Sequence, residues 1–467
     1  MTVLSIMASF VCVWAAIKGQ GASAILERLK AFRPTPRLVG TCAALIVPIY
    51  VIALLNLYAQ VRLEEGAPFD AWMQALPLPV YNGRTQNAAV HSTLSLIALC
   101  CGLVATLSRG VLAAALRHGI GRTTRRAFGV IAVLLAVVSV AAPAMSTTDP
   151  YEYVAAALLG LRAYVPPPGV LAGTIYAPIL PNIPLSGVIY GPLWVLVNSL
   201  QLSLGTSVFL KIELLRVWNV AFIGLLYVLL GRAGVSRNTR ALFVVNPALW
   251  YYVVANPHAD VQGLLLIVGA WIAAQRSRGI FAAVLLAGAG LIKLPFLLIG
   301  AAALAPLNGS RRRYAVWFGA AFGVALVSFL IPGAAYWHDF SHYVVHGTGH
   351  AHANLRDGWL LIAPIVAAVT VALLARRRAV YGAAWLFPQI APLAAAWYLL
   401  WGMPYAAVTG TLEAFVIAMP LATVLIDSTN SLALPGIAIA AALGVFLIVD
   451  LSTIIRSRQT SPIVTSV

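Results

Sequence analysis

The chain has 467 residues, of which 61% are hydrophobic and only 9% carry charge, and its mean hydropathy is +0.91. A soluble protein of this length exposes far more charge, so the composition excludes that class and predicts a polytopic membrane protein. The net charge of +17 comes from short basic clusters between apolar runs, as in cytoplasmic loops that face anionic lipid. We therefore expect the lipid bilayer, and no nucleic acid, as a partner. The four cysteines all lie in apolar stretches and indicate neither a disulfide framework nor a metal site.

The first third of the chain has the pattern of four membrane spans, expected at about 1–17, 38–58, 89–108 and 127–144. The first is interpreted as a retained span, because no basic region precedes it and no small-residue cleavage site follows it. The loop after the third span is predicted to be cytoplasmic because it is basic, with Arg109, Arg117, Arg122, Arg125 and Arg126. The fourth span then delivers residues 146–160 to the extracytoplasmic face.

A proline-rich stretch follows, in which residues 190–205 are too short and too badly placed to be a full span. If they crossed the membrane, the basic stretch 232–240 would fall outside the cell. We therefore expect one large external loop, 145–205, with juxtamembrane helices at about 151–163 and 190–204.

The second half of the chain continues the alternation, with spans expected at about 206–231, 241–256, 259–275 and 314–332. Between the last two, a single span would place the basic triplet 311–313 outside, so two half-helices that break around 291–295 are predicted instead. An external loop at 333–358, further spans and a last span at about 432–453 complete the chain. The predicted fold class is an all-α polytopic membrane protein with about 12–14 transmembrane helices, including the short half-helices.

This topology brings the scarce ionisable residues outside the basic loops to one face of the membrane. Each would cost roughly 2.5–3.5 kcal/mol at the bilayer centre unless it is paired or solvated. Their convergence predicts a water-accessible cleft for a polar substrate. The residues are Asp149, Glu152, His258, Asp260 and Lys293.

These residue types suit group transfer to a hydroxyl above the bilayer. Asp149, with the aromatic neighbours Tyr151 and Tyr153, suits a general base. Lys293 suits the stabilisation of a lipid-borne phosphate leaving group. The sequence has no Walker A loop, no GxSxG elbow and no dinucleotide fingerprint, which favours a membrane-borne activated donor.

Simpler structural interpretations stay open for each of these residues. Asp149 follows "STT" before an apolar helix and has the pattern of a helix cap, with Glu152 in the position of a capping box. His258 and Asp260 can be a satisfied loop pair, and Lys293 can snorkel from a continuous span. Glu213 and Arg216, three residues apart, are expected to form an internal ion pair.

The external loop at 333–358 contains five of the eight histidines, at 338, 342, 346, 350 and 352. His338, His342 and His346 recur at every fourth position, so a helix there would stack all three on one face, where two of them can hold a divalent ion. A polar loop that covers the substrate cleft is the favoured interpretation, and we expect no metal. Arg356 in the same loop can bind a phosphate or cap the next span.

Five motifs carry a resemblance to a known family. "DPYEYVAAALLG", "YGPLW", "NPALWYYVVANPHADV", "LIKLP" and "AWYLLWGMP" occur in this order over roughly residues 140–410. In this order the motifs resemble those of the GT-C glycosyltransferases, and in particular of the polyprenyl-phosphate-mannose-dependent α-mannosyltransferases of lipomannan synthesis. The chain departs from the family in having four expected spans before Asp149, and an alanine where a proline is expected before Trp397.

The resemblance implies a GT-C-like catalytic module at 127–425, an additional or variant set of helices at 1–126, and a C-terminal helix and tail at 426–467. It implies inverting transfer of a hexose, most simply mannose, from a polyprenyl-phosphate donor to an extracytoplasmic glycan or glycolipid, without a cofactor, in the cell (inner) membrane. Asp149 matches the family's catalytic base, and His258 and Asp260 its second polar motif. Lys293, with Arg356, is expected to bind the donor phosphate, and Tyr190 and Trp194 to line the lipid entrance.

Three other classes remain open at this point. A secondary transporter is expected to have two similar halves, and no repeat relates 1–230 to 231–467. A lipid-linked glycan ligase or polymerase of the O-antigen type would depend on loop arginines and histidines such as those at 333–358. A non-enzymatic lipid-binding protein would leave the carboxylates dispensable.

Overall fold

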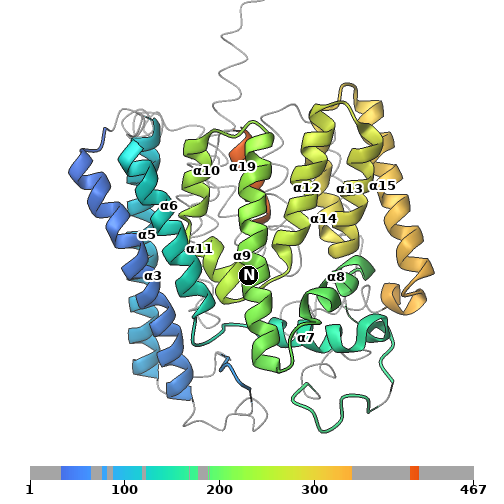
Figure 1. Cartoon of the computed structure of the whole chain (residues 1–467), viewed down its shortest axis with the longest axis horizontal. Helices are drawn as coiled ribbons and strands as arrows, with labels where there is room; N and C mark the ends of the chain where they lie inside the picture. Colours follow the sequence, from blue (N-terminus) through green and yellow to red (C-terminus); the bar gives the residue numbers. More distant parts are fainter. Residues whose placement is uncertain are drawn as a thin grey trace, which may run out of the picture.

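The computed structural model describes residues 33–64, 76–80, 88–117, 122–167, 169–176, 188, 190–338 and 400–409. Over these residues the chain is mostly helical, and the described extended backbone pairs only in an isolated bridge between Val80 and Met145. Long helices stand side by side, and two short helices, α7 and α8, lie across one end of them (Figure 1). The all-α prediction is thereby confirmed for the described part of the chain.

Three helices form the N-terminal side of the bundle: α3 (Pro36–Glu64), α5 (Ala88–Arg117) and α6 (Arg122–Val140). The prediction of a span at 89–108 followed by a basic loop is wrong at its end. Arg109 lies inside α5 with its side chain buried, and its Nη1 donates a 2.7 Å hydrogen bond to Asn246 Oδ1. The helix continues because "VLAAAL" after Gly110 consists mainly of strong helix formers.

The expected external loop contains the two predicted short helices. The first is α7 (Asp149–Leu159), which continues as the 3₁₀ turn η1 (Gly160–Tyr164), and the second is α8 (Pro192–Leu202). Each has a proline in its first turn, where the missing amide hydrogen is not needed. The long helix α9 (Val208–Arg232) follows, with Ser207 as its N-cap.

The predicted single span at 241–256 is in fact broken. It consists of α10 (Arg237–Val244), α11 (Pro247–Trp250) and the π turn η2 (Tyr251–Ala255). The break occurs because Asn246 caps α11, accepting from the amide of Ala248, and Pro247 has no amide to continue the preceding helix. The chain then bends by 118° into α12 (Asp260–Gln275).

The predicted half-helices between 279 and 310 are confirmed. Helix α13 (Gly279–Ile292) ends at Lys293, whose backbone is extended, and α14 (Pro295–Ile299) starts two residues later and continues as η3 (Gly300–Leu304). Helix α15 (Ser310–Leu330) completes this side of the bundle, and α19 (Met403–Thr409) packs against α9 and α10 (Figure 1).

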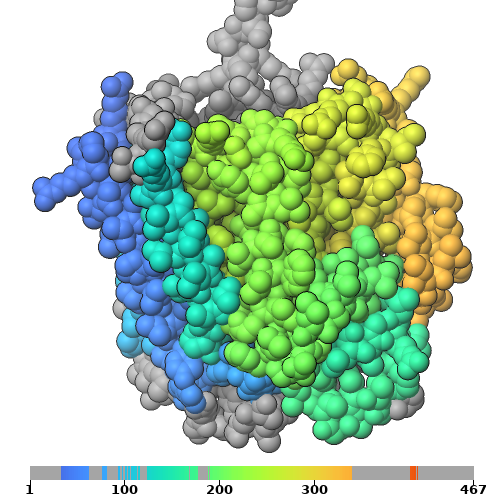
Figure 2. Space-filling view, in the orientation of Figure 1, coloured from blue at the N-terminus to red at the C-terminus, as the bar shows by residue number. Residues whose placement is uncertain are grey.

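Three helices of the described residues are long and apolar enough to cross a membrane, or four if the bent pair α11–η2 and α12 counts as one span. Their outer surfaces are apolar: Val217 on α9 and Phe322 on α15 are 53% and 69% exposed. Figure 2 shows α6 and α9 adjoining on one face, with the α7 and α8 region across the lower end. The basic residues at 276 and 278 lie in the connection between α12 and α13, and those at 311–313 lie in the first turn of α15. Both of these places are at the opposite end of the bundle from α7 and α8 (Figure 1). A membrane protein is the class these features define.

Several predictions fall on residues outside the described ranges. They are the spans at 1–17 and 432–453, the histidines from 342 onward, and Arg356. The total of 12–14 spans and the domain limits likewise stay predictions.

Candidate active site

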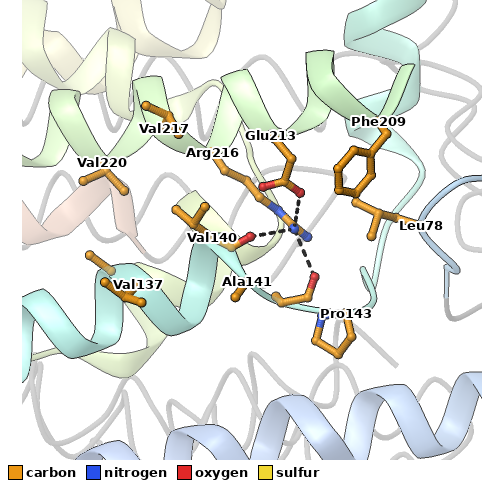
Figure 3. A pocket seen from close by; sticks show the side chains of 12 residues that line it. Leu78, Val137, Val140, Ala141, Pro143, Phe209, Glu213, Arg216, Val217 and Val220 are labelled. Carbon is orange, nitrogen blue, oxygen red and sulfur yellow. Dashed lines mark hydrogen bonds and ion pairs between the residues drawn. The ribbon is translucent and has the colours of Figure 1, made fainter. Parts of the chain in front are cut away.

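The segment that carries Asp149 is held in place by a buried arginine of α9. Arg216 is 1% exposed, and its guanidinium donates to the carbonyl oxygens of Val140, Ala142 and Ala255, each at 3.0 Å. Its Nη1 also lies 2.8 Å from Glu213 Oε1, which confirms the predicted ion pair (Figure 3). The end of α6 and the end of η2 are therefore joined through one side chain.

The Asp149 carboxylate is oriented by one hydrogen bond and lies close to a histidine. Thr147 Oγ1 donates a 2.8 Å hydrogen bond to Asp149 Oδ1, and His258 Nε2 lies 3.6 Å from Asp149 Oδ2. The N-cap of α7 is Thr148, whose side chain makes no capping bond. Asp149 is the first residue of the helix and not its N-cap, so the helix-cap interpretation does not describe it. Its carboxylate is directed at Thr147 and His258.

The imidazole of His258 is fixed in one orientation. Its Nδ1 lies 2.8 Å from the carbonyl oxygen of Asn256, which can only accept, so Nδ1 carries a hydrogen. Asn219 of α9 donates to the His258 carbonyl at 3.1 Å, and the Asn256 side chain accepts from the amide of Ser146 at 2.6 Å. The α11–α12 bend and the Asp149 loop are thereby connected, with Nε2 facing the carboxylate.

A second charged pair lies in the same region of the bundle, at the break between α13 and α14. Lys293 Nζ is 3.2 Å from Asp260 Oδ1, and the Asp260 side chain is 1% exposed. The indole Nε1 of Trp401 donates to the same oxygen at 2.7 Å. The ammonium also lies 5.3 Å from the ring centroid of Tyr190 and 5.2 Å from that of Trp401, within cation–π range of both.

Three aromatic side chains form a wall between α7 and the α13–α14 break. The hydroxyls of Tyr153 and Tyr190 are 2.9 Å apart, and the ring of Trp194 stacks on that of Tyr190 at 4.4 Å. Trp194 is 1% exposed, so it packs inside the protein and the expectation that it lines a lipid entrance is wrong. Its indole lies inside the protein because the face of α8 that carries Trp194 packs against α7.

Gly191 is the residue that allows this close approach. Its amide donates to the carbonyl of Ile292 at 3.1 Å, and a Cβ at this position would clash with the backbone of Leu291. The glycine of "YGPLW" therefore places Tyr190 directly against the backbone next to Lys293.

Tyr151 has a structural role and does not line the site. Its hydroxyl donates to the Leu78 carbonyl at 2.8 Å and accepts from the Leu78 amide at 3.0 Å. Both hydrogen bonds direct it toward residues 76–80. The alternation of side chains over "DPYEY" could not show this, because residues 76–80 are distant in sequence.

Glu152 lies three residues after Asp149, in the first turn of α7. Burial, and to a smaller extent the negative charge of Asp149, raises its pKa to about 8 from an ordinary value of 4.5. At neutral pH this carboxyl therefore holds a proton and can donate a hydrogen bond, whereas an ionised Glu152 can only accept.

The structure brings together Asp149, Glu152, Tyr153, Tyr190, His258, Asp260 and Lys293, which the sequence had predicted, around the ends of α7, η2, α12 and α13. Sequence reasoning missed three contributors: Thr147, Asn256 and Trp401. A polar residue two positions before Asp149 and an indole in "LLWGMP" were visible signals, but neither pattern specifies a partner. Arg356 lies outside the described residues.

A separate apolar cavity of about 760 Å³ lies beside this site, between α6 and α9 (Figure 3). Its polar lining groups are Glu213 and Arg216, which already pair with each other. The cavity therefore suits an apolar chain and not the chemistry of a polar substrate. Its lining includes Val137, Val140, Pro143, Phe209, Val217 and Val220.

Within the described residues, no three histidine, cysteine, aspartate or glutamate side chains come together as a set of metal ligands.

In the comparisons with known proteins, no family model, curated protein or solved structure matches the chain.

Proposed function

We propose that the protein is a membrane glycosyltransferase of the GT-C type, which moves a hexose from a polyprenyl-phosphate donor to a glycan or glycolipid acceptor. One observation carries the proposal. Asp149 supplies an oriented carboxylate, and Lys293 supplies an ammonium beside aromatic rings. Both lie near the buried His258, at one end of an apolar bundle. Transfer from a lipid phosphate needs a base for the acceptor and a cation for the leaving group.

In the proposed reaction, Asp149 takes the proton of an acceptor hydroxyl while that oxygen attacks the anomeric carbon of the sugar. The bond from this carbon to the phosphate oxygen breaks, and the oxygen keeps the electron pair. Lys293 stabilises the resulting polyprenyl phosphate, and the sugar inverts at its anomeric carbon. His258 Nε2, beside Asp149, is placed to stabilise the protonated carboxyl that forms.

The proposed setting follows from the arrangement of charge. The site lies at the end of the bundle opposite the basic connections, and this supports an extracytoplasmic active site in a cell (inner) membrane. The apolar cavity between α6 and α9 is suited to the isoprenoid tail, because Pro143 in its lining is only six residues before Asp149.

The proposal is tested by supplying proteoliposomes of the full chain with three donors that carry the same hexose: a polyprenyl phosphate, a polyprenyl pyrophosphate and a nucleoside diphosphate. Transfer to a glycan acceptor is expected from the first donor alone, measured as radiolabelled product. Use of the pyrophosphate donor would instead support the ligase or polymerase class. If no radiolabelled product forms with any of the three donors, the result would contradict a glycosyltransferase.

The raised pKa of Glu152 predicts how transfer depends on pH. Below about 8 the carboxyl is neutral, and above this value it ionises and adds a negative charge beside Asp149 and the donor phosphate. Transfer in the wild type is therefore expected to fall as pH rises above about 8. Glu152→Gln keeps the neutral form at all pH values and is expected to remove this decline. An unchanged alkaline decline in the variant would assign it to another group.

A further inference from the structure

Trp401 and Lys293 share one oxygen of Asp260, although 108 residues of sequence separate them. The indole N–H is the closer of the two, at 2.7 Å against 3.2 Å for the ammonium. Charge-assisted hydrogen bonds from an ammonium to a carboxylate usually measure about 2.7–2.9 Å. The Asp260 carboxylate is therefore bound more closely by the tryptophan than by the lysine.

The same indole also contacts the lysine through its ring. Lys293 Nζ lies 5.2 Å from the Trp401 ring centroid and 5.3 Å from that of Tyr190, so two aromatic rings and one carboxylate surround the ammonium. Both rings attract a cation without accepting a strong hydrogen bond from it. The two rings and the carboxylate therefore fix the position of the ammonium.

We infer that Trp401 is a positioning residue for phosphate recognition: it holds the Asp260 carboxylate back from Lys293, so that the ammonium can bind the phosphate of the lipid. The inference deepens the proposed function and rests on it. Without the indole N–H, Asp260 would pair fully with Lys293, and a phosphate would have to compete with that closer pair.

The segment that carries Trp401 is anchored independently of the charged pair. Tyr405 donates from its hydroxyl to the Ile299 carbonyl at 2.8 Å, and its ring lies 6.2 Å from that of Trp271. Tyr405→Phe thus removes one buried hydrogen bond from the same segment without touching Asp260. It is a matched control for any general loosening of residues 400–409.

The test measures binding of polyprenyl phosphate, which requires no sugar transfer, to the purified full chain in detergent, and also KM and kcat for the sugar donor. Trp401→Phe keeps an aromatic ring but removes the N–H donor to Asp260. Asp260 can then pair more closely with Lys293, and binding of polyprenyl phosphate is expected to weaken about tenfold, the scale of one hydrogen bond to a charged group. It should raise KM for the donor more than it lowers kcat. Trp401→His keeps a ring N–H and is expected to stay within about threefold of the wild type, as is Tyr405→Phe.

Equal losses of affinity in Trp401→Phe and Tyr405→Phe, or in the Phe and His variants, would overturn the inference and leave Trp401 as a packing residue. Wild-type affinity in Trp401→Phe would overturn it as well, with the proposed function intact. If the wild type itself does not bind polyprenyl phosphate, the proposed function fails, and this inference fails with it. If Trp401→Phe does not fold, the comparison of Trp401→His with Tyr405→Phe still decides, because a general packing role predicts loss in the His variant.

Discussion

Asp149→Asn is expected to lower sugar transfer by about 10²–10⁴, the usual range for loss of a general base. The amide keeps the size of the side chain, and its oxygen can still accept from Thr147 Oγ1, which now donates at 2.8 Å. It cannot take a proton from the acceptor. The measurement is single-turnover transfer from a radiolabelled donor, with monodisperse elution as the check on folding.

Donor binding in Asp149→Asn is expected to survive, because the acceptor and not the lipid phosphate meets this carboxylate. Thr147→Val is an informative companion, since it removes the hydroxyl that orients Asp149 and leaves the carboxylate in place. It should reduce transfer less than Asp149→Asn does. Near wild-type transfer in Asp149→Asn would refute the proposed mechanism.

Lys293→Met is expected to have the second large effect, and it acts in two ways. Loss of a preorganised donor to a developing oxyanion lowers turnover by about 10²–10³. In addition, the variant leaves Asp260 buried at 1% exposure without its cation, which costs about 3–5 kcal/mol of stability. Both effects are measurable, the first as kcat with the polyprenyl-phosphate donor and the second as a shift of thermal unfolding.

The double variant Lys293→Met/Asp260→Asn separates these two effects. Removing the orphaned charge should recover much of the stability, because Trp401 can still donate to the amide oxygen. Transfer should not recover, because no cation faces the phosphate. Recovery of transfer together with stability would show that Lys293 acts only in folding.

The sequence predicted the short helices and the α13–α14 break because these depend on local signals. Proline, glycine and the placement of basic clusters decide where a helix can continue and which loop faces inside, as at "LIKLP". The residues of the site could be selected because charge is rare in this chain. Lys293 and Asp260 stood out for this reason before any geometry was known.

What the sequence could not predict depends on contacts between distant segments. Arg109 looked like a loop residue because its partner, Asn246, lies 137 positions further along the chain. The neighbouring sequence gives no sign of that hydrogen bond. Trp194 looked like an interfacial aromatic, but α7 and Tyr190 bury it. Composition reports that a side chain is amphipathic, whereas only the packing of helices decides which face it presents.

The dependence of Arg216 on three carbonyls from other segments has a consequence for biogenesis. Helix α9 carries Lys211, Glu213 and Arg216 within its first three turns, and each charge opposes partition of an isolated helix into lipid. The arginine acquires its acceptors only when the end of α6 and the later η2 turn are both present. During synthesis, the two carbonyls at the end of α6 and Glu213 are therefore in place before α9 is complete, whereas the Ala255 carbonyl follows only 39 residues after Arg216.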